Sequence, residues 1–230
     1  MSGDVHVRFR ERLGGRFPGA TRLIVTGHSK EFLEQEVKPC VEAFLAERGL
    51  TLSVEKTHVT SIWEGFDFLG FNIRRFSGKL LTRPAQKSIQ SLCSKLRQIV
   101  KDNLTAKQSS LIRLLNPVIR GWVQYHRHGV AKKIFADVDN YLWQLLWRWA
   151  KRRHPNKMGT WIKDKYFRCV GHRHWVFAAI ENKQSSEMVM LVKARDTPIR
   201  RHLKIQCAAN PFDPIWDDYF TRRKYRRFRY

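Results

Sequence analysis

The chain lacks several features that mark familiar classes of protein. Its four cysteines, Cys40, Cys93, Cys169 and Cys207, lie far apart and form no CxxC pair, which excludes a zinc-finger or dithiol redox motif. No apolar run approaches the roughly 20 residues that a membrane-spanning helix needs. The N-terminus does not read as a signal peptide, so the dispersed cysteines favour a reducing, cytoplasmic location.

Residues that could build a catalytic or metal site are also scarce. Two-metal phosphoryl transfer needs clustered carboxylates, and Asp137 and Asp139, which flank an apolar stripe, are expected to be solvated. The neighbouring histidines are two residues apart, not the four of a helical metal site: His126/His128 and His172/His174. No glycine-rich phosphate loop, nucleophile elbow or Ser/His/Asp arrangement is recognisable. The sequence therefore predicts no catalytic residue, no metal and no cofactor.

Acidic residues are few, and the excess of basic residues is uneven. The 230 residues hold 44 Lys+Arg against 20 Asp+Glu, a formal net charge of +24. Residues 1–82 carry a net charge of +2, residues 83–168 carry +15, and residues 169–230 carry +7. A near-neutral first third before a strongly basic middle favours a polyanion-binding module, with nucleic acid as the leading partner. An anionic membrane is the weaker alternative, because no lipidation signal or Lys-rich amphipathic terminus is present.

The first third predicts a small sheet with one helix. Residues 1–19 are rich in Gly and Arg and are expected to hold no strong element. A short strand over 23–26 precedes a helix over 30–48, with Ser29 as N-cap, a kink at Pro39 and a stop at Gly49. A half-buried strand over 50–54 follows. Residues 59–63 and 66–73 then predict a hairpin that turns near Glu64-Gly65.

The middle third predicts three helices. The first carries an apolar stripe made of Ile89, Leu92, Leu96, Ile99 and Val100. Thr105 and Gln108 have the spacing of a capping box for the second helix, which ends near Gly129. In that helix, a core face recurs at three- and four-residue intervals: Leu111, Leu115, Val118, Trp122 and Tyr125. The third helix spans 132–153, with one stripe made of Ile134, Val138, Tyr141, Leu142, Leu145 and Trp149.

The last third is less regular. A short helix is expected over 161–168, and residues 175–179 and 188–192 predict paired strands. Residues 198–205 read as extended, and Asp213-Pro214 starts a short helix through Tyr219. The whole chain is therefore expected to be α+β, with a small strand–helix–strand–hairpin unit, a three-helix unit and a mixed C-terminal region.

Several motifs resemble the conserved blocks of one known family. Residues 115–125 read LNPVIRGWVQY. They resemble the LNPxIRGWxxY signature of the maturase-specific domain, also called domain X or thumb, of the group II intron maturases, which are intron-encoded reverse transcriptases. Its closing motif is matched by Leu142 and by RWAKRRHP over 148–155. Two further motifs resemble late blocks of the polymerase palm: GLTLSVEKT at 49–57 and GFDFLGF at 65–71. The first contains Lys56, and the second contains Leu69 and Gly70. ANPFDP at 209–214 resembles the segment after the thumb.

The chain departs from this family at the polymerase site. The family's catalytic Tyr-Ala-Asp-Asp should precede the strand, yet residues 19–22 read GATR before LIVTG. Without both aspartates the two catalytic metals lose their ligands, and the zinc-dependent HNH nuclease of many relatives is not recognisable either. The resemblance implies a palm remnant over 20–80, a thumb over 83–168, and a basic DNA-binding-like region over 169–230.

The leading hypothesis is a maturase-type protein that binds group II intron RNA and assists splicing, while the RNA supplies the catalysis. Phosphates are expected to meet basic and polar side chains of the predicted thumb: Arg113, Arg120, Gln124, Arg127, Lys132, Lys133, Arg148, Lys151, Arg152 and Arg153. Trp147 is the aromatic residue expected to be exposed for stacking on a base. Trp149 is expected to lie in the core.

Two alternatives remain open at the level of sequence. The chain could be the C-terminal piece of a reverse transcriptase that works only with an upstream palm and fingers chain. It could also be a decayed fragment that retains no function. The resemblance further implies a DNA target for the C-terminal region.

Overall fold

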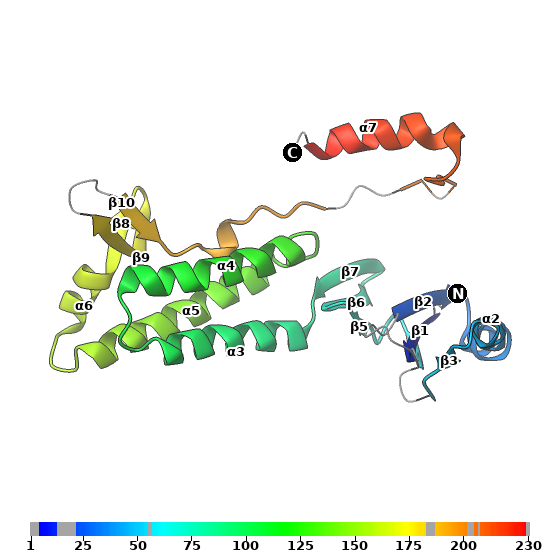
Figure 1. Ribbon diagram of the computed structural model, residues 1–230, viewed down its shortest axis with the longest axis horizontal. Coiled ribbons are helices and arrows are strands. Elements are labelled where there is room, and N and C mark those ends of the chain that lie inside the picture. The colour runs from blue at the N-terminus through cyan, green and yellow to red at the C-terminus, as the bar shows by residue number, and fades with distance from the viewer. Residues whose placement is uncertain are drawn as a thin grey trace. The chain divides into compact units, whose positions relative to one another are not determined.

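The computed structural model describes residues 5–12, 22–54, 57–182, 187–201, 205–206 and 208–228. Its contacts divide the chain into two compact units, Met1–Ala85 and Gln86–Tyr230, and each is described by itself (Figure 1). Helices and antiparallel strands occur together, so the predicted α+β class is confirmed.

The first unit contains a four-stranded antiparallel sheet built around β1 (Val5–Arg12). This strand pairs with β2 (Arg22–Gly27), with β3 (Thr51–Leu52) and with β4 (His58–Ser61). The strand predicted over 23–26 is confirmed, whereas the expectation that residues 1–19 hold no strong element is wrong for Val5–Arg12. Val and Phe alternate with His and Arg along β1, and this period of two is typical of a strand.

One helical segment packs on this unit, in three consecutive pieces: α1 (Lys30–Phe32), the π-helical η1 (Leu33–Val37) and α2 (Lys38–Ala46). Ser29 caps it as predicted, because its hydroxyl accepts a hydrogen bond from the Phe32 amide at 3.1 Å. Pro39 has no N–H to donate, and the wider π turn just before it takes the place of the predicted kink. Gly49 ends the segment with φ +68°. Leu33 is fully buried among Val25, Phe32, Val37, Val41, Leu52 and Val59.

A second antiparallel sheet follows, made of β5 (Phe66–Phe68), β6 (Phe71–Phe76) and β7 (Lys79–Pro84). The predicted hairpin at Glu64-Gly65 is wrong, because β4 pairs with β1 and not with β5. The chain reverses instead at Leu69-Gly70, where both residues have positive φ (46° and 78°). Such a pair is typical of the tight turn that matches strand twist, so residues 66–73 form two strands joined by a turn.

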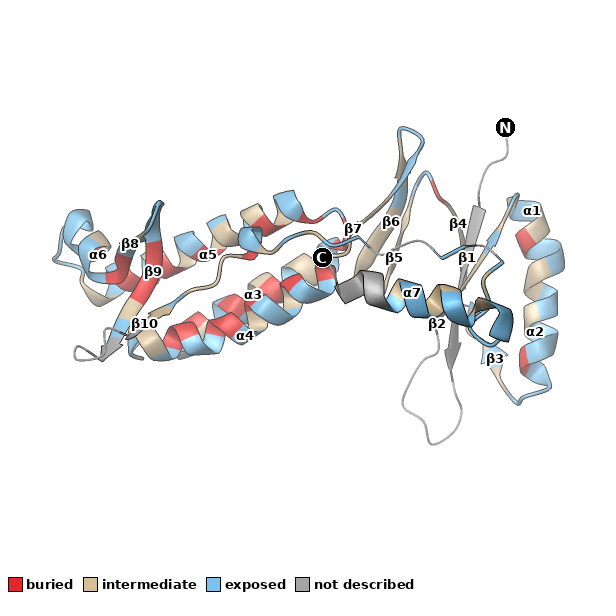
Figure 2. Ribbon diagram, turned by 90° about the horizontal axis from the view of Figure 1, so that it is seen from above, coloured by how far each residue is buried: buried red, intermediate tan, exposed pale blue. Residues whose placement is uncertain are grey.

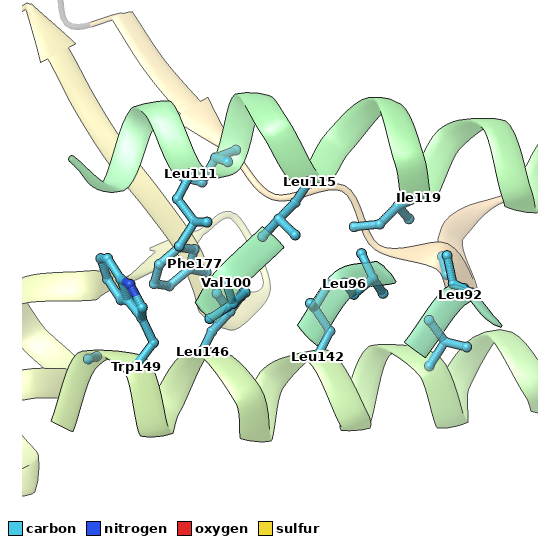
Figure 3. Close-up of a cluster of buried hydrophobic side chains, with 14 of the residues drawn as sticks. Leu92, Leu96, Val100, Leu111, Leu115, Ile119, Leu142, Leu146, Trp149 and Phe177 are labelled. Carbon is cyan, nitrogen blue, oxygen red and sulfur yellow. The ribbon is translucent and has the colours of Figure 1, made fainter. Parts of the chain in front are cut away.

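The second unit is built on three long helices, α3 (Gln86–Asp102), α4 (Gln108–His126) and α5 (Lys132–Arg153). All three were predicted, and the third has the predicted limits. Their apolar faces meet in one core, which Figure 3 shows with Leu96, Leu115, Leu142 and Trp149 pointing toward one another. The core includes Trp149, as expected.

The buried face of α4 is rotated from the predicted one. Leu111 and Leu115 are buried as expected, but Tyr125 is 51% exposed, so its placement in the core is wrong. Ile119 and Val123 take its place, because α3 and the strands after α5 contact α4 from two sides and widen its buried arc. The capping box is also wrong. Lys107 precedes the helix without a side-chain cap, and Gln108 donates from its amide to the carbonyl of Tyr166 at 2.7 Å.

After α5 come α6 (Gly159–Tyr166) and the antiparallel strands β8 (Phe167–Val170), β9 (Arg173–Asn182) and β10 (Glu187–Met190). The predicted pairing of 175–179 with 188–192 is confirmed for β9 and β10, whereas β8 was not predicted. Phe167 and Phe177 belong to the same core as the helices, so the packing continues past residue 168 (Figure 2). Asp213 caps η4 (Pro214–Trp216) as predicted, and α7 (Asp217–Phe228) extends beyond the expected end at Tyr219.

Residues 190–200, which we call the strap, run from β10 along α4 (Figure 1) and are fastened to α4 and α5 by hydrogen bonds. Asn116 donates to the Met190 carbonyl and accepts from the Val192 amide, both at 2.9 Å. The Arg200 amide donates to the carbonyl of Arg127 at 3.0 Å. The strap includes η3 (Ala194–Asp196), whose ends are held by α5.

Candidate nucleic-acid interface

The outer face of α4 combines basic, polar and apolar side chains. At ~100° per residue the exposed residues fall within about 140° of arc. Arg113, Arg120 and Gln124 form one edge of this face, Pro117 and Gly121 lie in its middle, and Leu114 and Tyr125 form the other edge; all of them are exposed. The structure therefore places three of the predicted RNA-contacting side chains together on one helix surface.

The solvent-facing side of α5 presents four more of them. Lys133, Arg148, Lys151 and Arg152 are exposed. The Arg148 Nε donates to the Gln144 carbonyl one turn earlier, at 3.3 Å, which leaves the charge at the surface. Long basic side chains on a helix surface can follow a phosphate backbone without fixed geometry.

Three predicted contact residues make hydrogen bonds within the chain. The Lys132 ammonium donates to the carbonyls of Arg195 at 2.6 Å and Thr197 at 3.4 Å. Arg153 donates to the carbonyls of Leu104 at 2.9 Å and Ala106 at 2.8 Å, and stacks 4.7 Å from the Trp149 ring. Arg127 donates to the side-chain oxygen of Gln124. Lys132 and Arg153 thus fasten loops to α5, whereas Arg127 pairs with its own helix. Contact between these three side chains and phosphate stays a prediction.

Asp139 has a structural role that its sequence position did not suggest. Its two carboxylate oxygens accept from the amides of Ala194 at 2.8 Å and Arg195 at 2.9 Å, so it caps η3 from another helix. Burial raises the pKa of this carboxyl, against the two hydrogen bonds, which lower it. The expectation that Asp139 is simply solvated is wrong. Asp139 and Lys132, two turns apart on α5, hold opposite ends of the same 3-10 turn.

The prediction that Trp147 is exposed is wrong. Trp147 is half-buried and packs against the core, whereas Trp143 is more exposed and stacks on it with ring centroids 5.8 Å apart. Trp175 of β9 meets both rings edge-on, at 5.9 and 5.7 Å. Residue spacing alone cannot bring Trp175 to this place, because the β8–β9 pairing was not visible in the sequence.

The backbone at Trp175 is strained. Its φ of +60° is rare for a bulky side chain and costs on the order of 1–3 kcal/mol. An irregularity in the β8–β9 register lies beside it. Ring contacts with Trp143, Trp147 and Phe167 hold the indole in position, and the Lys163 ammonium lies 5.2 Å from its ring centre.

A hydrogen-bonded chain of Ser88, Trp122 and His126 joins α3 to α4. Ser88 of α3 accepts a hydrogen bond from the Trp122 indole at 3.1 Å and lies 3.0 Å from His126 Nε2. Because the indole can only donate, the hydroxyl proton is available to an unprotonated Nε2. Burial lowers the pKa of His126 to about 4, which keeps the ring neutral at pH 7. The hydroxyl and the imidazole thus satisfy each other inside the core.

The three palm-motif positions have separate outcomes. Leu69 and Gly70 form the turn between β5 and β6, and Leu69 is exposed. Lys56 lies outside the described residues. Across the part of the chain that the structure describes, no three His, Cys, Asp or Glu side chains are grouped to hold a metal ion. No described helix is long and apolar enough to cross a membrane.

Comparisons with known proteins found one matching family and two similar proteins. Residues 89–167 match the sequence profile of the family described as "Group II intron, maturase-specific domain". Two curated relatives are both named "Ribosomal operon-associated A protein". The one from Euglena longa is 27% identical over 150 residues, which cover 64% of this chain and 28% of the relative. The one from Euglena gracilis is 34% identical over 98 residues, which cover 40% of this chain and 18% of the relative. The chain therefore spans less than a third of the length of these relatives.

Proposed function

We propose that this chain binds group II intron RNA and assists its splicing, because residues 89–167 match the family of group II intron maturase-specific domains. The observation that carries the proposal is the set of exposed basic side chains on α4 and α5, within a region of net charge +15. Phosphates supply dense negative charge, and their neutralisation releases counterions. The protein would stabilise the folded intron while the RNA carries out the reaction.

The first test is the salt dependence of binding to a group II intron RNA. We expect the logarithm of the affinity to fall linearly with the logarithm of salt concentration. Exchanging Lys151 and Arg152 for glutamine should reduce that slope by about 1.5, at roughly 0.7–0.9 for each lost phosphate contact. Filter binding or fluorescence anisotropy at several salt concentrations measures both quantities.

A matched control removes the same charge from the other unit. Lys30 and Lys38 are ion-paired with Glu34 at 3.7 Å and with Glu42 at 4.0 Å. Their exchange for glutamine lowers the net charge equally and should leave the slope nearly unchanged. An affinity that hardly responds to salt, or equal losses in the two double variants, would contradict the proposed interface.

A second prediction concerns Gly121, in the middle of the outer face of α4. A Cβ at this position would meet nothing within 4 Å, so the fold does not require glycine there. Gly121→Ala should therefore raise the free energy of unfolding by up to about 1 kcal/mol, the usual helix preference for alanine. If the RNA backbone approaches this face closely, the same variant should bind RNA several-fold more weakly. Urea unfolding and RNA titration together test these opposite signs, and unchanged RNA affinity would exclude close approach at Gly121.

Splicing itself provides the functional readout. We expect the chain to lower the Mg²⁺ concentration at which a bound group II intron splices, and the Lys151/Arg152 variant to lose this effect. The resemblance also leads to two predictions that remain separate: a DNA target for the C-terminal region, and an upstream reverse transcriptase chain as partner. Primer extension on an RNA template by the chain alone would favour the polymerase interpretation over the splicing role.

A further inference from the structure

The exposed rings of α5 and β9 form an aromatic cluster at the surface of the helical unit. Trp143 is 37% exposed and Trp175 is 39% exposed. Trp143 stacks on Trp147 with an angle of 10° between the ring planes, and Trp175 meets both edge-on. One face of the Trp143 ring stacks on Trp147, so the exposed part of Trp143 belongs to the rest of its surface.

A shallow hollow that is open to solvent lies beside this cluster. Its lining includes Trp143, Trp175 and Lys193, together with the buried side chains of Leu146 and Phe177. Trp147 is not among the described residues that line it, but Phe167 and Trp175, which do line it, both contact the Trp147 ring.

From this geometry we infer that the hollow, which we call the tryptophan pocket, receives an unpaired base of bound RNA, packed against the exposed rings of Trp143 and Trp175. The inference rests on the proposed RNA binding and assigns the part of the RNA that enters this site. Lys193 at the side of the pocket and Lys163 over Trp175 supply positive charge for the adjoining phosphates. Indole rings stack on any base, so the pocket selects unpaired over paired nucleotides and not one sequence.

Charge identifies the occupant. The pocket lies in a unit whose residues 83–168 carry +15, and both carboxylate oxygens of Asp139 at its edge already accept backbone hydrogen bonds. A hydrophobic protein segment would not need this cationic surround, whereas a splayed base on a phosphate backbone is complementary to it.

The experiment compares two RNAs of equal charge. The probe is an oligoadenylate about ten nucleotides long, a typical single-strand site size, with one central 2-aminopurine. Its counterpart carries abasic riboses in the central positions. The wild-type chain is expected to quench the 2-aminopurine and to bind the base-containing RNA about five- to a hundredfold more tightly than the abasic one.

The pocket variant is Trp143→Leu, which keeps apolar bulk and removes the aromatic face. It should lose both the quenching and the preference, while its weaker binding to the abasic RNA stays at the wild-type level. The matched control is Trp161→Leu: Trp161 is equally exposed, at 38%, but its ring is covered by Lys157 and Lys165. That control should keep the preference.

The possible failures are distinguishable. If neither RNA binds, the proposed function fails. If both RNAs bind equally well to the wild-type chain, or if Trp143→Leu keeps the preference, RNA binding stands and the pocket assignment is wrong. A change in oligomeric state on Trp143→Leu, without a change in base preference, would assign the cluster to a contact between copies of the chain instead.

Discussion

Replacing Asn116 with alanine is expected to lower the free energy of unfolding of the helical unit by about 2 kcal/mol, the contribution of two partly buried hydrogen bonds to the backbone. Asn116 is only 8% exposed, and its amide pairs with the Met190 carbonyl and the Val192 amide as another strand would. The alanine variant loses both hydrogen bonds at once. Asn116→Asp should cost at least as much, because a carboxylate cannot donate to the Met190 carbonyl.

Urea unfolding followed by tryptophan fluorescence measures this loss, since seven of the eight tryptophans lie in residues 86–230. The matched control is Asn140→Ala on α5, where the side chain is exposed and the expected change is within about 0.5 kcal/mol. Equal stabilities of the two variants would show that the strap does not depend on Asn116.

Acidification is expected to destabilise the helical unit by about 3 kcal/mol between pH 7 and pH 4 through His126 alone. The folded-state pKa is about 4, below the ordinary value of 6.5, because the imidazole is 1% exposed. Between these two values the unfolded chain binds a proton that the folded one does not. Stability from this group is therefore complete above pH 6.5 and is lost as the pH falls toward 4. A second proton on the ring would also leave the Ser88 hydroxyl hydrogen without its acceptor.

His126→Gln separates this effect from general acid unfolding. Glutamine can accept from Ser88 through its side-chain oxygen and does not titrate in this range. The variant will be less stable at pH 7, but the difference between wild type and variant should shrink by about 3 kcal/mol as the pH falls to 4. Parallel stability curves for the two proteins would show that His126 titrates normally in the fold.

The helices could be predicted from the sequence because their information is local. Apolar spacing fixed α3, α4 and α5, and the limits of α5 were predicted to the residue. The predictions that failed concern residues whose actual partners lie far away in the sequence. Thr105 and Gln108 have capping-box spacing, yet Gln108 is used by Tyr166, 58 residues away. Gly65 has positive φ as a turn glycine should, but the hairpin forms at Leu69-Gly70 because β4 has its partner in β1.

The site could be predicted in part. Charge and helix position correctly placed Arg120, Lys151 and Arg152 at the surface. Lys132 and Arg153 carry the same charge, but their partners are backbone carbonyls 63 and 49 residues away, and a sequence does not reveal which carbonyls lack a partner. Trp175 was missed for a related reason, since its position depends on a backbone conformation that tryptophan rarely adopts. Polar residues within an apolar stripe, such as Asn116 and Asp139, were the available sign of the strap.

The strap is synthesised well after α4, the helix that it covers. Asn116 emerges from the ribosome 74 and 76 residues ahead of its partners. At about 5–20 residues per second this delay lasts several seconds. During this time α3, α4 and α5 are already synthesised, but the side of α4 that the strap covers has no cover. The nascent chain therefore exposes the apolar side of α4. Ribosome-associated chaperones are expected to bind this side until residue 200 has emerged.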